Sequence, residues 1–309
     1  MTVRKEAAKL RFGLCCIFRQ EPIRFRQVTA RTLRQLSRTE QLTRLSGICL
    51  DNVLSLRQAL GFADDHSIGA FRILSPLFPR FTHPEVGYRL EELPDRDMIA
   101  ALCAEIRFFR ENHDLRLSFH PDQFNVLASP RPEVVKNTVG ELCYQGMLAE
   151  LVGAEVINLH VGGAYGDKEE ALVRLAANLE GLPGEVLKRL TLENDDNSFT
   201  PADLLPVCEK LAIPMVYDVH HHRCLPDGLS IEEATGRTTA LWQKLGRESY
   251  FHISSPKNGW RDGSPKPHAD YIDPGDFPYC WLGLNATIDV EAKAKELAVI
   301  RLRHDLGLA

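Results

Sequence analysis

The amino-acid sequence predicts a closed (β/α)₈ barrel that forms a single domain. Eight short apolar runs alternate with longer helical patterns, and eight is the strand count of such a barrel. The first run, RFGLCCIFRQ, contains no G-x-G-x-x-G turn, which an open doubly wound sheet often carries. The 309 residues are 44% hydrophobic, and no linker, internal repeat or low-complexity tract divides them. We therefore expect one domain over residues 1–309.

Each predicted strand is a short β-like run of apolar residues. The eight runs lie at residues 11–18, 69–75, 115–120, 155–161, 189–194, 213–219, 250–255 and 281–290.

The predicted helices lie between these runs. SPRPEVV and FTPADLL each place a Ser or Thr cap and an early proline at a helix start. The helical patterns lie at residues 28–45, 96–112, 133–153, 167–182, 201–211, 230–247 and 290–305.

Composition argues for a reduced cytoplasmic protein. No run of 18 apolar residues predicts a membrane span, and the basic N-terminus MTVRKEAAKLRFG lacks the apolar core of a secretory signal. The eight cysteines form no C-x-x-C pair, so neither a zinc ribbon nor a disulfide framework is expected.

Imidazoles and carboxylates follow the predicted strands at the end where barrel enzymes form their active sites. One histidine at such a position is usually structural, but four strand ends carry one, and the two strands between them end in Glu and Asp. So many titratable groups would be costly to gather unless cations bound them. The nine candidates are His83, His120, His160, Glu193, Asp218, His221, His252, His268 and Glu291.

This mixed nitrogen and oxygen set favours Zn²⁺, Mn²⁺ or Fe²⁺ over Ca²⁺ or Mg²⁺, and nine ligands are enough for two or three ions. Within VYDVHHH, we expect His221 in the loop after the strand to be the ligand, since strand geometry disfavours His220 and His222. Clustered divalent ions clamp a phosphodiester and activate water. The predicted catalytic residues are the carboxylates Glu193, Asp218 and Glu291.

The order of eight motifs resembles the UV damage endonucleases, metal-dependent DNA repair nucleases related to the endonuclease IV barrel. The motifs are FRILSPLFP, SFHPDQF, NLHVGG, LENDD, YDVHHH, HISSPK, HADYI and EAKAKE, and the resemblance covers about residues 11–300. It implies a TIM barrel with up to three divalent ions, commonly Mn²⁺ with Zn²⁺ as the alternative, bound by the same nine residues. It also implies incision of damaged double-stranded DNA on the 5′ side of a lesion, leaving a 3′-hydroxyl. Separately, we expect a monomer associated with the nucleoid.

The chain departs from that family at three positions. The family inserts a Gln-Tyr pair into the duplex, and here the pair reads Gln123-Phe124, which keeps a stacking face but loses the hydroxyl. Phe124 is alternatively a loop aromatic that covers the barrel mouth. Leu14 replaces a tyrosine of the first strand, and Tyr250 replaces a lysine that can be carboxylated. None of these changes touches a predicted ligand, so we expect metal binding to survive while lesion choice changes.

Two basic segments are candidate DNA contacts. The loop SSPKNGWRDGSPK interleaves an aromatic with basic residues, which suits backbone contacts and base stacking. Residues 1–44 hold 11 Lys and Arg against three acidic residues, although the net charge of the chain is −5. Solvated surface is the alternative for both segments. The predicted DNA-binding residues are Gln123, Phe124, Lys257, Trp260, Arg261, Arg19 and Arg24.

Two other functions stay open at this point. A sugar isomerase or epimerase of the xylose-isomerase-like superfamily also uses His, Glu and Asp at strand ends, but it needs fewer ligands and a small enclosed pocket. A non-catalytic lesion-binding protein would bind damaged DNA without cleaving it, and Leu14 and Tyr250 are the changes that favour it.

Overall fold

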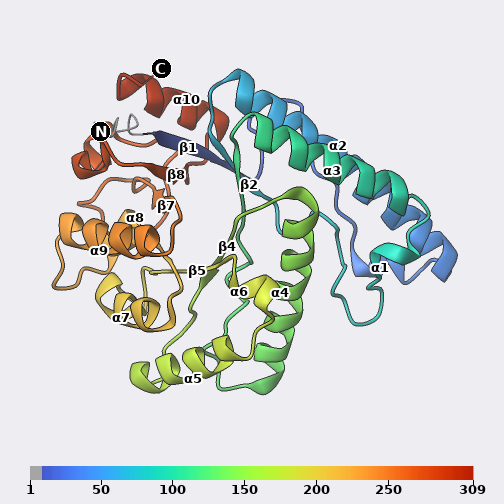
Figure 1. Ribbon diagram of the computed structural model, residues 1–309, viewed down its shortest axis with the longest axis horizontal. Helices are drawn as coiled ribbons and strands as arrows, with labels where there is room; N and C mark the ends of the chain where they lie inside the picture. Colours follow the sequence, from blue (N-terminus) through green and yellow to red (C-terminus); the bar gives the residue numbers. More distant parts are fainter. Residues whose placement is uncertain (1–8, 309) are drawn as a thin grey trace, which may run out of the picture. The chain divides into compact units, whose positions relative to one another are not determined.

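The computed structural model describes residues 9–308, and its strands follow one another in the closed barrel order β1 to β8. The predicted (β/α)₈ fold class is confirmed. Figure 1 traces the alternation of strands and helices along the chain. The strands are β1 (Leu10–Cys15), β2 (Ala70–Ile73), β3 (Arg116–Phe119), β4 (Val156–His160), β5 (Leu190–Glu193), β6 (Met215–Asp218), β7 (Ser249–Ile253) and β8 (Ala286–Val290). Among these residues, no helix has the length and apolar character that a membrane crossing requires.

The contacts divide the chain into two compact parts. The first part comprises the described residues up to Leu14 together with Thr191 onward, and the second comprises Cys15–Leu190. The expectation of a single domain over residues 1–309 stays a prediction.

In the first part, β6, β7 and β8 are parallel neighbours, and β1 pairs with β8. The register places Asp218 opposite His252 and His252 opposite Asp289, so three polar residues lie at one level of the sheet. Its helical segments are α7 (Pro201–Leu211), α8 (Val219–Cys224), α9 (Ile231–Lys244), η2 (Pro274–Asp276), η3 (Tyr279–Trp281) and α10 (Glu296–Asp305).

In the second part, β2, β3 and β4 are parallel neighbours, with Phe119 paired to Ile73 on one side and to Ile157 on the other. These three apolar residues are fully buried, which anchors the strands whose ends carry His120 and His160. Its helical segments are α1 (Ala30–Leu33), α2 (Arg38–Asp65), η1 (Leu90–Glu92), α3 (Arg96–Asn112), α4 (Pro132–Val152), α5 (Lys168–Glu180) and α6 (Gly184–Leu187).

The predicted helix over residues 28–45 is wrong in both extent and continuity. Thr29 caps the four-residue α1, and Ser37 then starts α2 through a capping box in which its backbone N–H donates to Glu40. The sequence analysis missed the remainder of α2, although its buried residues Ile48, Cys49 and Val53 recur at helical spacing.

Three smaller expectations also fail. Ser129 does not cap α4, because its hydroxyl accepts from Arg131, which itself precedes the helix. The strand expected over 281–290 begins only at Ala286, after the 3₁₀ turn η3. The helix expected over 290–305 begins at Glu296, since Lys295 has a positive φ of 55° and interrupts the backbone.

Candidate metal centre

Five of the predicted ligands gather in the first part of the chain. Glu193 ends β5, Asp218 ends β6, His252 lies in β7, and Glu291 directly follows β8. His221 lies in α8 rather than in the expected loop. Glu193 and His252 are each 1% exposed and Asp218 is fully buried, so these groups are withdrawn from water.

The ligand atoms form two groups that share Asp218. One group is Glu193, Asp218 and His221, and the other is Asp218, His252 and Glu291, with the atoms of each group within 4.8 Å of one another. The His252 Nδ1 lies 3.1 Å from Glu193 Oε1 and 3.4 Å from Glu291 Oε1. Such a shared carboxylate between two sets of N and O donors suits neighbouring divalent cations.

Local hydrogen bonds explain how Asp218 is held. Its Oδ1 accepts the backbone N–H of His221 at 2.8 Å and so caps α8, which brings the His221 ring back over the strand end. Asn194 accepts from the Asp218 backbone N–H and donates to its carbonyl, both at 2.9 Å. The ends of β5 and β6 are thereby tied together.

The other oxygen of Asp218 is the clearest sign that a cation fits. Within residues 9–308, Asp218 Oδ2 is buried and has no hydrogen-bond partner, while His221 Nδ1 lies 3.6 Å away. Burying an unsatisfied polar atom costs about 1–3 kcal/mol, and more for a charged one. A bound cation would remove this cost.

The charge of the cluster also perturbs His221. Burial, the largest single influence, lowers its pKa, but the carboxylates of Asp218, Glu193 and Glu291 together outweigh burial and raise the pKa to about 9. Without a cation, this imidazole therefore carries a proton near neutral pH and offsets part of the surrounding negative charge.

The three adjacent histidines have different partners. The Tyr217 hydroxyl lies 2.7 Å from His222 Nδ1, and Asp227 Oδ1 lies 3.0 Å from His222 Nε2. His220 Nε2 lies 3.2 Å from the Lys266 carbonyl oxygen. His221 is the one that approaches the carboxylates of Glu193 and Asp218, because a helical turn, rather than strand alternation, points successive side chains in different directions.

His268 stands at the margin of the same cluster. An isolated antiparallel bridge between Pro256 and His268 positions it. Its Nδ1 lies 3.2 Å from the Ser254 hydroxyl and 3.8 Å from Glu291 Oε2, and the side chain is partly exposed.

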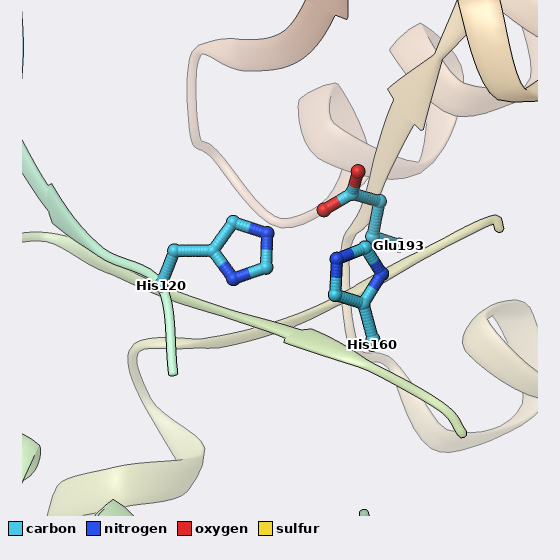
Figure 2. Close-up of side chains that lie close together, drawn as sticks. All are labelled: His120, His160 and Glu193. Atoms are coloured by element: carbon cyan, nitrogen blue, oxygen red, sulfur yellow. The ribbon is translucent and has the colours of Figure 1, made fainter. Parts of the chain in front are cut away.

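The predicted ligands of the second part are three histidines. His120 directly follows β3 and His160 ends β4, and their ring centroids lie 4.7 Å apart. Figure 2 draws the two rings; Glu193, also drawn there, belongs to the first part. His83 Nδ1 accepts from the backbone N–H groups of Glu85 and Val86, so its Nε2 is the ring atom that faces other partners.

The residues predicted to contact DNA differ in their exposure and in their bonds within the protein. Gln123 and Phe124 are exposed, and Phe124 reaches 80%. Lys257 and Arg261 are exposed in the loop, but the Trp260 indole donates to Asp276 at 2.7 Å and packs against the His220 ring.

The basic stretch near the N-terminus is more neutral than its sequence suggests. The Arg24 guanidinium bonds to the Ile23 and Glu21 carbonyl oxygens of its own loop. Acidic residues beyond position 44 pair with other members of the stretch, in the ion pairs Arg26–Asp51, Arg34–Glu85 and Arg38–Glu92. Arg19 is exposed.

Two residues near the cluster escaped the sequence analysis. Asn194 joins the two strand ends, and Asp289 is a fully buried carboxylate in β8. The signal for Asp289 was its spacing, since alternate strand residues share a face and Glu291 lies two positions further on.

The fold and the buried cluster define a class, the (β/α)₈-barrel enzymes that gather imidazoles and carboxylates able to bind metal at the carboxyl ends of their strands. Residues 10–308 match the family model described as UV-endonuclease UvdE. The chain belongs to this family of DNA-cleaving hydrolases.

Similar proteins support this membership. A UV DNA damage endonuclease of Bacillus velezensis is 33% identical over 96% of this chain and 94% of its own length. One of Bacillus pumilus is 34% identical over 88% of this chain and 86% of its own length.

Solved structures show the same fold. The crystal structure of SacUVDE superposes with a TM-score of 0.84 at 28% identity, covering 97% of this chain and all of that one. Endonuclease IV from Thermus thermophilus, at 16% identity, reaches a TM-score of 0.59 over 97% of this chain and 100% of its own. A D-tagatose 3-epimerase-like protein, at 15% identity, reaches 0.58 over 96% of both chains. At these identities the last two comparisons concern the fold alone.

Proposed function

We propose that the protein is a metal-dependent DNA repair endonuclease that nicks the backbone of damaged double-stranded DNA. The cut would fall 5′ to a UV photoproduct or another lesion and leave a 3′-hydroxyl. The observation that carries the proposal is the buried Asp218 carboxylate shared by two groups of metal-ligating side chains in a member of the UV-endonuclease family.

The proposed ligands are the nine residues at strand ends, and the proposed cofactors are two or three divalent ions, Mn²⁺ or alternatively Zn²⁺. Bound there, such ions supply phosphate binding, water activation and stabilisation of the leaving oxyanion. Glu193, Asp218 and Glu291 contribute the negative charge that retains the cations, and the imidazoles complete the donor set without adding charge. The ligands are His83, His120, His160, Glu193, Asp218, His221, His252, His268 and Glu291.

On the DNA side, the exposed Phe124 ring is the proposed wedge between bases, with Gln123 beside it. Lys257, Arg261 and Arg19 are proposed to contact phosphates. Arg24 and Trp260 contribute through the shape of their loops, because both already bond within the protein. We further propose a monomer that acts on the nucleoid in the cytoplasm.

A nicking assay on defined duplexes tests this function. With Mn²⁺, the protein should cut an oligonucleotide duplex that carries a photodimer and leave an undamaged duplex of the same sequence intact, and a duplex with an abasic site would measure the breadth of lesion choice. Binding of the damaged duplex without cleavage at any Mn²⁺ concentration would instead favour a non-catalytic lesion-binding protein.

Removing metal should destabilise the protein, because the carboxylates of the cluster then repel one another without a cation between them. A ligand at a hundredfold excess over its Kd stabilises the native state by about 2.7 kcal/mol. For a protein of 309 residues that corresponds to a fall in Tm of about 4 °C when a chelator is added. Differential scanning calorimetry measures it, and an equal Tm with Mn²⁺ and with chelator would contradict the proposed metal centre.

Removing two loop charges should weaken DNA binding without regard to damage. The double variant Lys257→Ala/Arg261→Ala should lower the slope of log affinity against log salt by about 1 for each phosphate that the loop no longer neutralises, equally for damaged and undamaged duplexes. Fluorescence anisotropy across a salt series measures this slope. The matched control is Lys210→Ala/Lys244→Ala, which removes two exposed lysines from α7 and α9. An identical slope in both double variants would exclude the loop as a phosphate-binding segment.

A further inference from the structure

The buried carboxylate of Asp289 lies next to the proposed ligand His252. Asp289 lies in β8 with no exposed surface, at the position that pairs with His252 of β7. The Tyr250 hydroxyl donates to Asp289 Oδ1 at 3.0 Å, and Asp289 Oδ2 lies 3.8 Å from His252 Nε2. The three side chains thus run in sequence from a phenol through a carboxylate to an imidazole.

The two nitrogens of His252 face different surroundings. Nδ1 faces the cluster, where Glu193 Oε1 lies at 3.1 Å and Glu291 Oε1 at 3.4 Å, whereas Nε2 faces Asp289. To bond to a carboxylate in the metal-free state, Nδ1 must carry a proton. To bind a cation, the same atom must offer its lone pair, so the ring proton has to reside on Nε2.

Asp289 supplies the acceptor that this second state needs. An ionised carboxylate only accepts hydrogen bonds, so it favours the tautomer with the proton on Nε2 and makes Nδ1 the basic atom. The 3.8 Å separation is longer than a hydrogen bond, so the ring must move toward Asp289 before Nε2 can donate to it.

Tyr250 explains how Asp289 keeps this orientation. The phenol is almost fully buried, and its hydroxyl donates to Oδ1, while Oδ2 lies on the side of His252 Nε2. The phenol of Tyr250 is therefore linked, through Asp289, to a proposed metal ligand.

We propose that Tyr250 and Asp289 form a positioning pair that holds His252 in the tautomer able to bind a divalent cation through Nδ1. The inference rests on the proposed metal centre and adds two positioning residues to it. Neither residue is assigned contact with the substrate.

Affinity for Mn²⁺, measured by isothermal titration calorimetry on the full chain, tests the pair without using activity. Asp289→Asn keeps the shape of the side chain but removes its charge, and its amide can donate to Nε2, which would favour the wrong tautomer. We expect affinity to fall about 10–100-fold, the usual effect of removing a carboxylate that supports a ligand histidine. Tyr250→Phe should weaken binding by a smaller factor, about tenfold.

The double variant Tyr250→Phe/Asp289→Asn distinguishes coupled action from separate damage. If Tyr250 acts through Asp289, the double variant should bind Mn²⁺ no more weakly than Asp289→Asn alone. Nitrogen-15 NMR of the histidines with Zn²⁺ added gives a second readout, since the fraction of His252 that binds Zn²⁺ through Nδ1 with its proton on Nε2 should be lower in Asp289→Asn than in Tyr250→Phe.

Asp227→Asn is the matched control, because Asp227 is the carboxylate partner of another buried histidine, His222, at 3.0 Å. It should lower the Tm and leave Mn²⁺ affinity unchanged. Wild-type affinity in both Asp289→Asn and Tyr250→Phe would overturn the positioning pair. A wild-type protein that binds Mn²⁺ but cuts no duplex would overturn the proposed function. The comparison of Mn²⁺ affinities among the variants would then still test the positioning pair. A wild-type protein that binds no divalent cation would overturn both.

Discussion

Replacing Asp218 with alanine should abolish the nicking of UV-irradiated duplex DNA. Asp218 is the one carboxylate common to both ligand groups, so its loss weakens both at once. Removing a single group that stabilises transition-state charge in other enzymes lowers the rate by about 10²–10³-fold. Because Asp218 serves two groups, we expect a loss of at least about a thousandfold in the single-turnover rate with Mn²⁺. Glu193→Ala should behave likewise, since Glu193 contacts both His221 and His252.

The Asp218→Asn variant separates an effect on catalysis from an effect on folding. Asparagine is as good a helix cap as aspartate, so the bond to the His221 backbone N–H should persist, and so should the backbone bonds to Asn194. Without metal, the variant loses a buried negative charge and should have a Tm equal to or above that of the wild type in chelator. Wild-type nicking by Asp218→Asn would show that the shared carboxylate is not part of the catalytic centre.

Replacing Phe124 with alanine should selectively weaken the binding of damaged DNA. An exposed aromatic that stacks on a base contributes about 1–3 kcal/mol, so the affinity for a lesion duplex should fall about tenfold or more, while binding to intact duplex changes little. The side chain is 80% exposed, so its removal should leave the Tm unchanged. Anisotropy titrations on paired damaged and intact duplexes measure the difference.

Phe108→Ala is the control, because Phe108 lies on α3 and is 68% exposed. It removes a comparable exposed ring and should alter neither affinity. A lower Tm for Phe124→Ala, with unchanged preference for damage, would support the alternative that Phe124 merely covers the barrel mouth.

The sequence predicted the barrel because its eight strands follow from simple periodicity. Short apolar runs repeat eight times, and polar groups such as Glu193 and Asp218 follow them where a barrel presents its strand ends. The cluster of the first part brings together five side chains that are up to about a hundred positions apart in the sequence. These five are among the nine residues that the sequence placed at the strand ends.

What the sequence could not predict are features that depend on distant partners. The excess of positive charge near the N-terminus looked available for DNA binding, yet Arg34 and Arg38 form ion pairs with Glu85 and Glu92 from outside that segment. His221 was assigned to a loop because no local pattern shows that Asp218 would start a short helix immediately at the strand end. The contact between Tyr250 and Asp289 joins the neighbouring strands β7 and β8 and depends on their register, which the near-continuous apolar runs of a parallel sheet buried on both faces do not reveal.

The paired hydrogen bonds between Asn194 and the Asp218 backbone have a kinetic consequence. The Asn194 side-chain amide bonds to both the N–H and the carbonyl of Asp218, so it adds two hydrogen bonds between the ends of β5 and β6. The Asp218 amide proton should therefore exchange with deuterium only on the slow timescale of global unfolding.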